Sequence, residues 1–226
     1  MPIIESIQVA AVSVPLDKVT SFSTRTVSER HYCIVKVRSK EGIEGIGFCY
    51  VGSAGGAIAK VAVEQLLAKK LIGQNSHRSE GLWMEMYDES ILQGRAGSVM
   101  RAISILDTAL WDLNARSAGL PLHQYLGSVV EDRVPAYASG GYYLEGKTPA
   151  KLGKEMESYV KQGFKAVKMK VGRLSPREEE ERVRAARIAV GDDVLLTLDA
   201  NNAWRDLPTA MEYIRRFEDY NPYWIE

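Results

Sequence analysis

Two lysines lie two residues apart in a short apolar segment in the second half of the chain. The segment reads Ala-Val-Lys-Met-Lys-Val and contains Lys168 and Lys170. Residues two apart on a β-strand point to the same face, so both amines would project together. Two lysines on a buried face are costly unless they stand at the end of the strand, where an active site can use them. An exposed edge strand with two solvated lysines is the alternative interpretation.

The next two strand-like segments also end in residues that can do chemistry. One ends in Asp199, with Asn201 two residues later, and the last ends in Glu226. An Asp after a strand is often only a helix N-cap, so each residue alone is weak support. In a parallel barrel, however, the carboxyl ends of successive strands converge on one mouth, where catalytic groups are found. The coincidence of three such strand ends predicts one site built from amines and carboxylates.

Alternation of strands and helices from residue 134 onward predicts how these side chains are positioned. Strands are expected at 134–138, 166–171, 194–199 and from 223, with helices at 151–162, 176–190 and 207–217. Repeats of this length imply right-handed βαβ units around a parallel sheet. Periodicity alone does not separate an open sheet from a barrel.

The first 130 residues follow a different pattern, in which strands precede helices. Strands are expected at 6–14, 32–37 and 45–50, and helices at 57–71, 80–88 and 98–117. A polar stretch, 17–30, separates the first two strands, and Pro15 argues against a continuous central strand across it. We interpret this stretch as a functional or mobile loop. The change of pattern predicts two domains, at residues 1–130 and 131–226.

The motifs in these segments resemble the enolase superfamily, and within it the mandelate racemase/muconate lactonizing enzyme family. Segments 166–172 (AVKMKVG), 198–204 (LDANNAW) and 224–226 (WIE) are similar to the family's lysine motif and its first two metal-ligand motifs. Segment 105–113 is similar to the long helix of the family's capping domain. The resemblance covers essentially the whole chain. It implies an α/β protein with an N-terminal α+β capping domain, followed by the first half of an enolase-like (β/α) TIM-type barrel.

The resemblance also implies a reaction, in which a magnesium-dependent enzyme removes the proton next to a carboxylate to give an enediolate. Lys170 matches the general base, and the positive charge of Lys168 disfavours the protonated form of its neighbour and can hold the substrate carboxylate. Asp199 and Glu226 match the first two metal ligands. Carboxylate oxygens suit Mg²⁺, and Mn²⁺ is expected to substitute. Asn201 is a candidate contact with the substrate or the metal shell.

Arg25 lies in a polar segment, 20–26, that is similar to the family's loop which closes over the substrate. We interpret Arg25 as a contact for an acidic substrate, and a solvated loop arginine is the alternative. A polar loop of this kind favours a hydroxy or sugar acid, and hence an acid-sugar dehydratase or a racemase/epimerase. A cycloisomerase of the muconate lactonizing type is the next choice. A Schiff-base aldolase with Lys170 as nucleophile and a non-catalytic assembly module remain open.

The family pattern also requires groups that this sequence does not supply. A third carboxylate is expected on the strand after Glu226, and an acid or second base further round the barrel. We therefore expect the chain to be part of a longer enzyme, inactive by itself and a homo-oligomer when complete.

Several other side chains that can do chemistry are expected to be structural. Trp83 and Trp111 are interpreted as core residues rather than ligand platforms. Cys33 and Cys49 lie on strands that read as neighbours, so a disulfide is conceivable, but two reduced thiols in a cytoplasmic protein are the preferred interpretation.

Composition excludes two classes of partner. Lys+Arg and Asp+Glu both number 29, so the net charge is zero and no basic excess suggests nucleic acid. No uncharged apolar run is long enough to span a bilayer, and the first residues lack the pattern of a signal peptide. A small carboxylate is thus the expected partner, in the cytoplasm.

Overall fold

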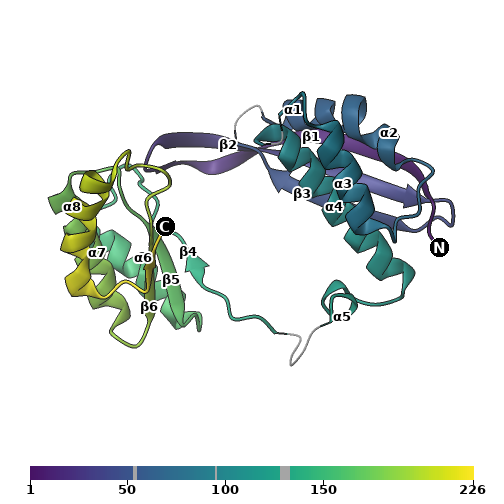
Figure 1. The fold of residues 1–226 in the computed structure, drawn as a ribbon. Coiled ribbons are helices and arrows are strands. Elements are labelled where there is room, and N and C mark those ends of the chain that lie inside the picture. The colour runs from purple at the N-terminus through teal and green to yellow at the C-terminus, as the bar shows by residue number, and fades with distance from the viewer. Residues whose placement is uncertain (53–54, 95, 128–132) are drawn as a thin grey trace. The chain divides into compact units, whose positions relative to one another are not determined.

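The computed structural model describes residues 1–52, 55–94, 96–127 and 133–226, which form two compact units. The first unit comprises Met1–Leu16 and Glu29–Asp132, and the second comprises Asp17–Ser28 and Arg133–Glu226 (Figure 1). Within the described residues, no helix combines the length and the apolar character needed to cross a membrane.

The first unit is a three-stranded sheet covered by helices. The strands β1 (Ile4–Phe22), β2 (Arg25–Ser39) and β3 (Glu44–Tyr50) lie in that order. The helices are α1 (Gly55–Val61), the π-helix η1 (Ala62–Leu67), α2 (Ala68–Leu71), α3 (Ser79–Glu89), α4 (Ser98–Ser117) and α5 (Leu122–Tyr125). Helix α4 packs so closely on β3 that a Cβ at Gly47 would lie 2.0 Å from the carbonyl oxygen of Ile105. Glycine at this position therefore permits the contact.

The polar stretch 17–30 is a β-hairpin, which corrects the expectation of a loop. Strand β1 continues through Pro15 as far as Phe22. This is possible because β1 is an edge strand, where a missing N–H donor leaves no partner unpaired. The end of the hairpin belongs to the second unit, in which Ser21 and Tyr143 exchange two backbone hydrogen bonds of 3.1 and 2.9 Å.

The second unit contains a four-stranded sheet whose neighbouring strands are parallel. Its order is β4 (Ala138–Ser139), β5 (Ala166–Lys170), β6 (Leu195–Asp199) and β7 (Trp224–Ile225). The helices α6 (Pro149–Lys161), α7 (Pro176–Val190) and α8 (Leu207–Phe217) alternate with the strands, and the short η2 (Glu218–Tyr220) precedes β7 (Figure 1). The expected strand 134–138 is shorter than predicted, because backbone pairing with β5 begins only at Ala138.

The two faces of β5 and β6 differ in the way that the alternation predicts. Val167, Met169, Leu196 and Leu198 are fully buried in the core formed with α6, α7 and Phe217. The side chains between them on each strand point to the opposite face, which is the face that carries the candidate site.

A buried ion pair between Glu179 and Arg182 of α7 fixes the segments that follow β4 and β5. The two side chains are 3.2 Å apart and only 0% and 4% exposed. Glu179 accepts a hydrogen bond from the backbone N–H of Arg173 at 3.0 Å. Arg182 donates to the carbonyl oxygens of Gly141 and Lys170 at 2.9 and 3.2 Å. These hydrogen bonds therefore fix the backbone at the carboxyl ends of β4 and β5, where the candidate site lies.

We expect Glu179→Gln to lower the free energy of unfolding by about 3 kcal/mol, because it leaves the buried Arg182 without its counter-charge. Urea denaturation followed by circular dichroism measures the change. Glu181→Gln is the matched control on the same helix, since Glu181 forms an exposed surface pair with Arg177 at 3.8 Å. Such surface pairs contribute about 0–1 kcal/mol. Equal losses in the two variants would show that the buried pair has no special role.

Candidate active site

The four residues predicted to share a site converge at the ends of β5, β6 and β7. Lys168 and Lys170 are only 8% and 7% exposed, and Asp199 is 2% exposed. The interpretation of an exposed edge strand with solvated lysines is therefore wrong. The parallel register places Lys170 directly opposite Asp199, and Glu226 follows β7 next to them.

The charged groups of these residues form one connected network. Lys170 Nζ donates to Asp199 Oδ2 at 2.6 Å. Lys168 Nζ lies 3.4 Å from the same oxygen and 3.2 Å from Glu226 Oε1. A single ammonium group thus bridges the two carboxylates, so oxygens from neighbouring strands already surround one cation.

The network changes the protonation equilibria of its members. Burial favours the neutral amine of Lys168, but the hydrogen bond to Glu226 and the charge of Asp199 outweigh it, so the pKa of Lys168 is raised. Burial likewise favours the neutral form of Asp199, but the hydrogen bond and charge of Lys170 hold the pKa of Asp199 below its usual value. Both effects favour the charged forms that the network pairs.

Two tyrosines that the sequence analysis did not single out lie beside the lysines. The Lys168 ammonium lies 5.3 Å from the ring centroid of Tyr137, and the Lys170 ammonium lies 5.5 Å from that of Tyr142. These are cation–π distances. The sequence signal that could have identified Tyr142 is the Gly140–Gly141 pair directly before it, because paired glycines after a strand indicate that the backbone closely approaches another segment.

Asn201 lies at the rim of the network in a left-handed conformation, with φ 47°. Its backbone N–H donates to Asp199 Oδ1 at 2.9 Å. Its side-chain Oδ1 is buried and has no hydrogen-bond partner among the described residues. A buried polar oxygen normally has a partner, so this unpaired Oδ1 needs one, and a role of Asn201 toward substrate or metal stays a prediction.

The structure does not bring Arg25 to the network. Arg25 is exposed at the start of β2, and among the described residues it forms no hydrogen bond or ion pair with Lys168, Lys170, Asp199 or Glu226. The hairpin end itself is anchored beside β5. Ser23 Oγ donates to the carbonyl oxygen of Val171 at 2.5 Å, and Arg173 Nη1 donates to that of Phe22 at 3.2 Å.

The donor set fits a magnesium ion in part. Asp199 and Glu226 offer the hard oxygens that Mg²⁺ prefers, and they already share one cationic neighbour in Lys168. Within the described residues, no group of three or more His, Cys, Asp or Glu side chains is placed to hold a metal. Magnesium is often held by one or two carboxylates, with water and substrate completing its shell. The two carboxylates therefore suffice as a partial site.

Comparison with protein-family models assigns both parts of the chain. Residues 4–127 match the model described as "Mandelate racemase / muconate lactonizing enzyme, N-terminal domain", and residues 151–226 match "Enolase C-terminal domain-like". The chain belongs to the mandelate racemase/muconate lactonizing enzyme family of the enolase superfamily. The resemblance found in the sequence is confirmed, and with it the fold of an α+β domain followed by part of a TIM-type barrel.

Relatives of this chain have several different activities. It is 36% identical to the arabinonate dehydratase of Saccharolobus solfataricus, over 84% of this chain and 50% of that protein. It is 32% identical to the 3,6-anhydro-α-L-galactonate cycloisomerase of Streptomyces coelicolor, over 99% of this chain and 61% of that protein. A racemase from Streptomyces coelicolor, solved with bound magnesium, matches with a TM-score of 0.92 and 32% identity, over 99% and 62% of the two chains. The chain thus spans 50–62% of the length of these relatives.

Proposed function

We propose that this chain carries the general base and two metal ligands of an enzyme that removes the α-proton of a hydroxy or sugar acid. One observation carries the proposal. Lys170 Nζ lies 2.6 Å from Asp199 Oδ2, in a network where Lys168 bridges Asp199 and Glu226. An amine base beside two carboxylates that can hold a divalent cation is what this chemistry needs.

Each residue of the network has a role in the proposed reaction. Lys170 Nζ accepts the α-proton, and the Lys168 ammonium holds the substrate carboxylate in place. Asp199 and Glu226 hold magnesium, which when bound stabilises the negative charge that develops on the substrate carboxylate. Asn201 contributes its unpaired Oδ1 to the substrate or the metal shell.

The substrate side of the proposal rests on the relatives and on the hairpin. An acid-sugar dehydratase or a racemase/epimerase is the first choice, supported by relatives with these activities. A cycloisomerase is the second candidate, because a relative with that activity matches over 99% of this chain. Arg25 is proposed to contact an acidic substrate, since it follows the hairpin turn whose Ser23 is anchored beside β5.

The proposal has three further parts. Mn²⁺ substitutes for Mg²⁺, because both favour oxygen ligands. The complete protein is a homo-oligomer, which the exposed apolar side chains of Ile46, Phe48 and Tyr50 on β3 support. It works in the cytoplasm, in keeping with two free cysteines, Cys33 and Cys49, that lie directly opposite each other in the sheet. Light scattering of the product of the complete gene tests the assembly, and a monomer would remove that part.

Screening the product of the complete gene against aldonic and aldaric acids with magnesium tests the function. We expect turnover of at least one acid sugar and no turnover of the corresponding neutral sugars. Borohydride added during turnover should cause no irreversible loss of activity, because Lys170 forms no imine in the proposed reaction. Rapid trapping would instead support the Schiff-base aldolase. No turnover of any acid in the collection would support a non-catalytic module.

A further inference from the structure

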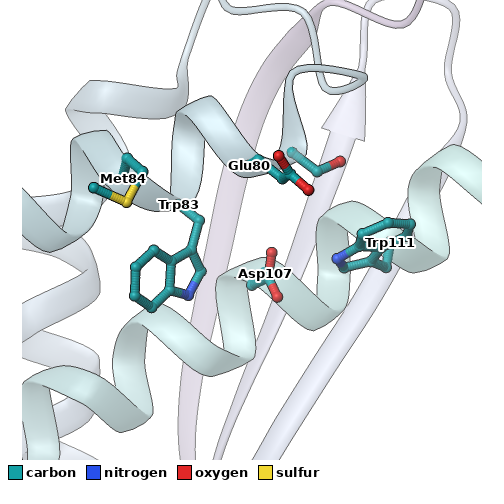
Figure 2. A pocket seen from close by; sticks show the side chains of 6 residues that line it. Glu80, Trp83, Met84, Asp107 and Trp111 are labelled. Atoms are coloured by element: carbon teal, nitrogen blue, oxygen red, sulfur yellow. The ribbon is translucent and has the colours of Figure 1, made fainter.

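The first unit contains a pocket between α3 and α4 that lies outside the proposed active site. It is a cavity of about 320 Å³ lined by Ser79, Glu80, Trp83, Met84, Asp107 and Trp111. Figure 2 shows Asp107 between the rings of Trp83 and Trp111, with Glu80 on the side of α3. The volume is at the lower end of the range for small-ligand sites. Trp83 packs against the core of the first unit, as expected, and also forms one wall of this cavity. Trp111, expected in the core, is half-buried and forms the other wall.

Helical spacing and aromatic contacts build these walls. Glu80 and Trp83 are three residues apart on α3, and Asp107 and Trp111 are four apart on α4, so each pair shares one helix face. The ring of Trp83 stacks on Tyr87, with centroids 5.0 Å apart and planes 15° apart. The ring of Trp111 meets Tyr125 edge-on at 6.1 Å. Both indoles are therefore held in place before any ligand binds.

The two carboxylates of the pocket lack a positive partner. Neither Glu80 nor Asp107 forms an ion pair with a described residue. Arg78, a nearby cation, is engaged by Glu85 at 2.8 Å and Gln74 at 2.9 Å. Burial raises the pKa of Asp107, and a hydrogen bond from Trp111 offsets this only in part. A half-buried carboxylate without a counter-charge is a cost to the fold that a bound cation would remove.

We propose that this pocket binds an organic cation, an alkylammonium or alkylguanidinium group, with its charge against Asp107 and Glu80 and its carbon chain between the two indoles. Indole faces attract cations, and carboxylates form charge-assisted hydrogen bonds with N–H donors. An anion would meet two negative charges there. The cation can come from a small molecule or from a Lys or Arg side chain of a polypeptide. None of these residues belongs to the proposed active site, so the inference does not depend on that function.

Titration with ethylguanidinium, followed by NMR, tests the proposal. The chain has four tryptophans, so the indole N–H signals of Trp83 and Trp111 can be assigned by substitution. We expect saturable shifts of these two signals, and none with ethylurea, a neutral molecule of nearly the same shape. N-acetylarginine methylamide identifies the source of the cation. Tighter binding of this amide than of ethylguanidinium assigns the pocket to a side chain, and the reverse assigns it to a free cation.

Asp107→Asn should weaken the binding of ethylguanidinium by roughly tenfold or more, because it removes a charged hydrogen-bond partner. Asn retains an acceptor for Trp111, so the variant should fold. Asp88→Asn is the control, because Asp88 is an exposed carboxylate on α3 that does not line the pocket. This variant should leave the affinity for ethylguanidinium unchanged. Unchanged affinity in Asp107→Asn, equal binding of ethylurea, or no saturable shift with either cation would overturn the proposal.

Thermal melts of the same variant separate loss of binding from loss of folding. The folded-state pKa of Asp107 is raised, so protonation favours the folded state, and this advantage is lost as pH rises through the folded pKa. At neutral pH the carboxylate is therefore unfavourable without a ligand. Asp107→Asn should melt at a temperature equal to or above that of the wild type. A lower melting temperature would contradict the claim that the Asp107 carboxylate lacks a counter-charge.

Discussion

Lys170→Ala will lower kcat by about 10²–10⁴-fold while substrate still binds, because it removes the proposed general base and leaves the other polar groups in place. Lys170 is the lysine that the parallel register sets opposite Asp199, with Nζ 2.6 Å from the carboxylate. Steady-state kinetics of the complete gene product on its acid-sugar substrate measure the effect. The split between kcat and KM separates a lost base from a lost binding contact.

Two further lysine variants calibrate this result. Lys168→Ala should raise KM as well as lower kcat, because Lys168 is proposed to hold the substrate carboxylate. Lys161→Ala should have no effect, since that side chain is 70% exposed on α6 and pairs with Glu157 on the same helix. Full activity in Lys170→Ala would show that the base has been assigned wrongly.

Asp199→Asn or Glu226→Gln will weaken magnesium binding by at least roughly tenfold and lower activity with it, because each replaces an anionic oxygen donor by a neutral amide. Isothermal titration calorimetry of the complete gene product measures the affinity. Asp199 is the more sensitive position, since its carboxylate is buried, whereas the Glu226 side chain is 54% exposed.

Chelation provides the corresponding test in the unmodified protein. EDTA should abolish turnover, and either Mg²⁺ or Mn²⁺ should restore it. Asp219→Asn is the control, because Asp219 is an exposed carboxylate in η2 away from the strand ends. Activity that survives thorough chelation would remove the metal from the proposed reaction.

Elements that local chemistry determines were predicted with accurate bounds. Helices α4, α7 and α8 begin and end where the sequence placed them. For α7 the reasons are explicit, with a capping box at Ser175, Pro176 in the first turn and Gly191 after the last residue. The shared face of Lys168 and Lys170 followed from the two-residue alternation of a strand, and their convergence with Asp199 and Glu226 from the rule that the carboxyl ends of parallel strands meet.

Features that depend on distant contacts were missed. The hairpin through 17–28 read as a loop, because its polar sequence hides the local strand pairing and its anchor at Tyr143 lies far along the chain. Tyr142 reaches Lys170 only because the preceding loop packs against β5, where a Cβ at Gly141 would lie 2.5 Å from Met169 Cβ. Local pattern carries no information about such packing. The same holds for the pocket at Trp111, whose ring read as core.

The release of an α-deuterium label tests most directly whether this site removes an α-proton. An acid-sugar substrate deuterated at its α-carbon is incubated with the complete gene product and magnesium, and deuterium NMR follows the label. We expect the wild type to release deuterium into the solvent water and Lys170→Ala to release almost none. A wild-type product that keeps its α-deuterium in full would contradict α-proton abstraction by this site.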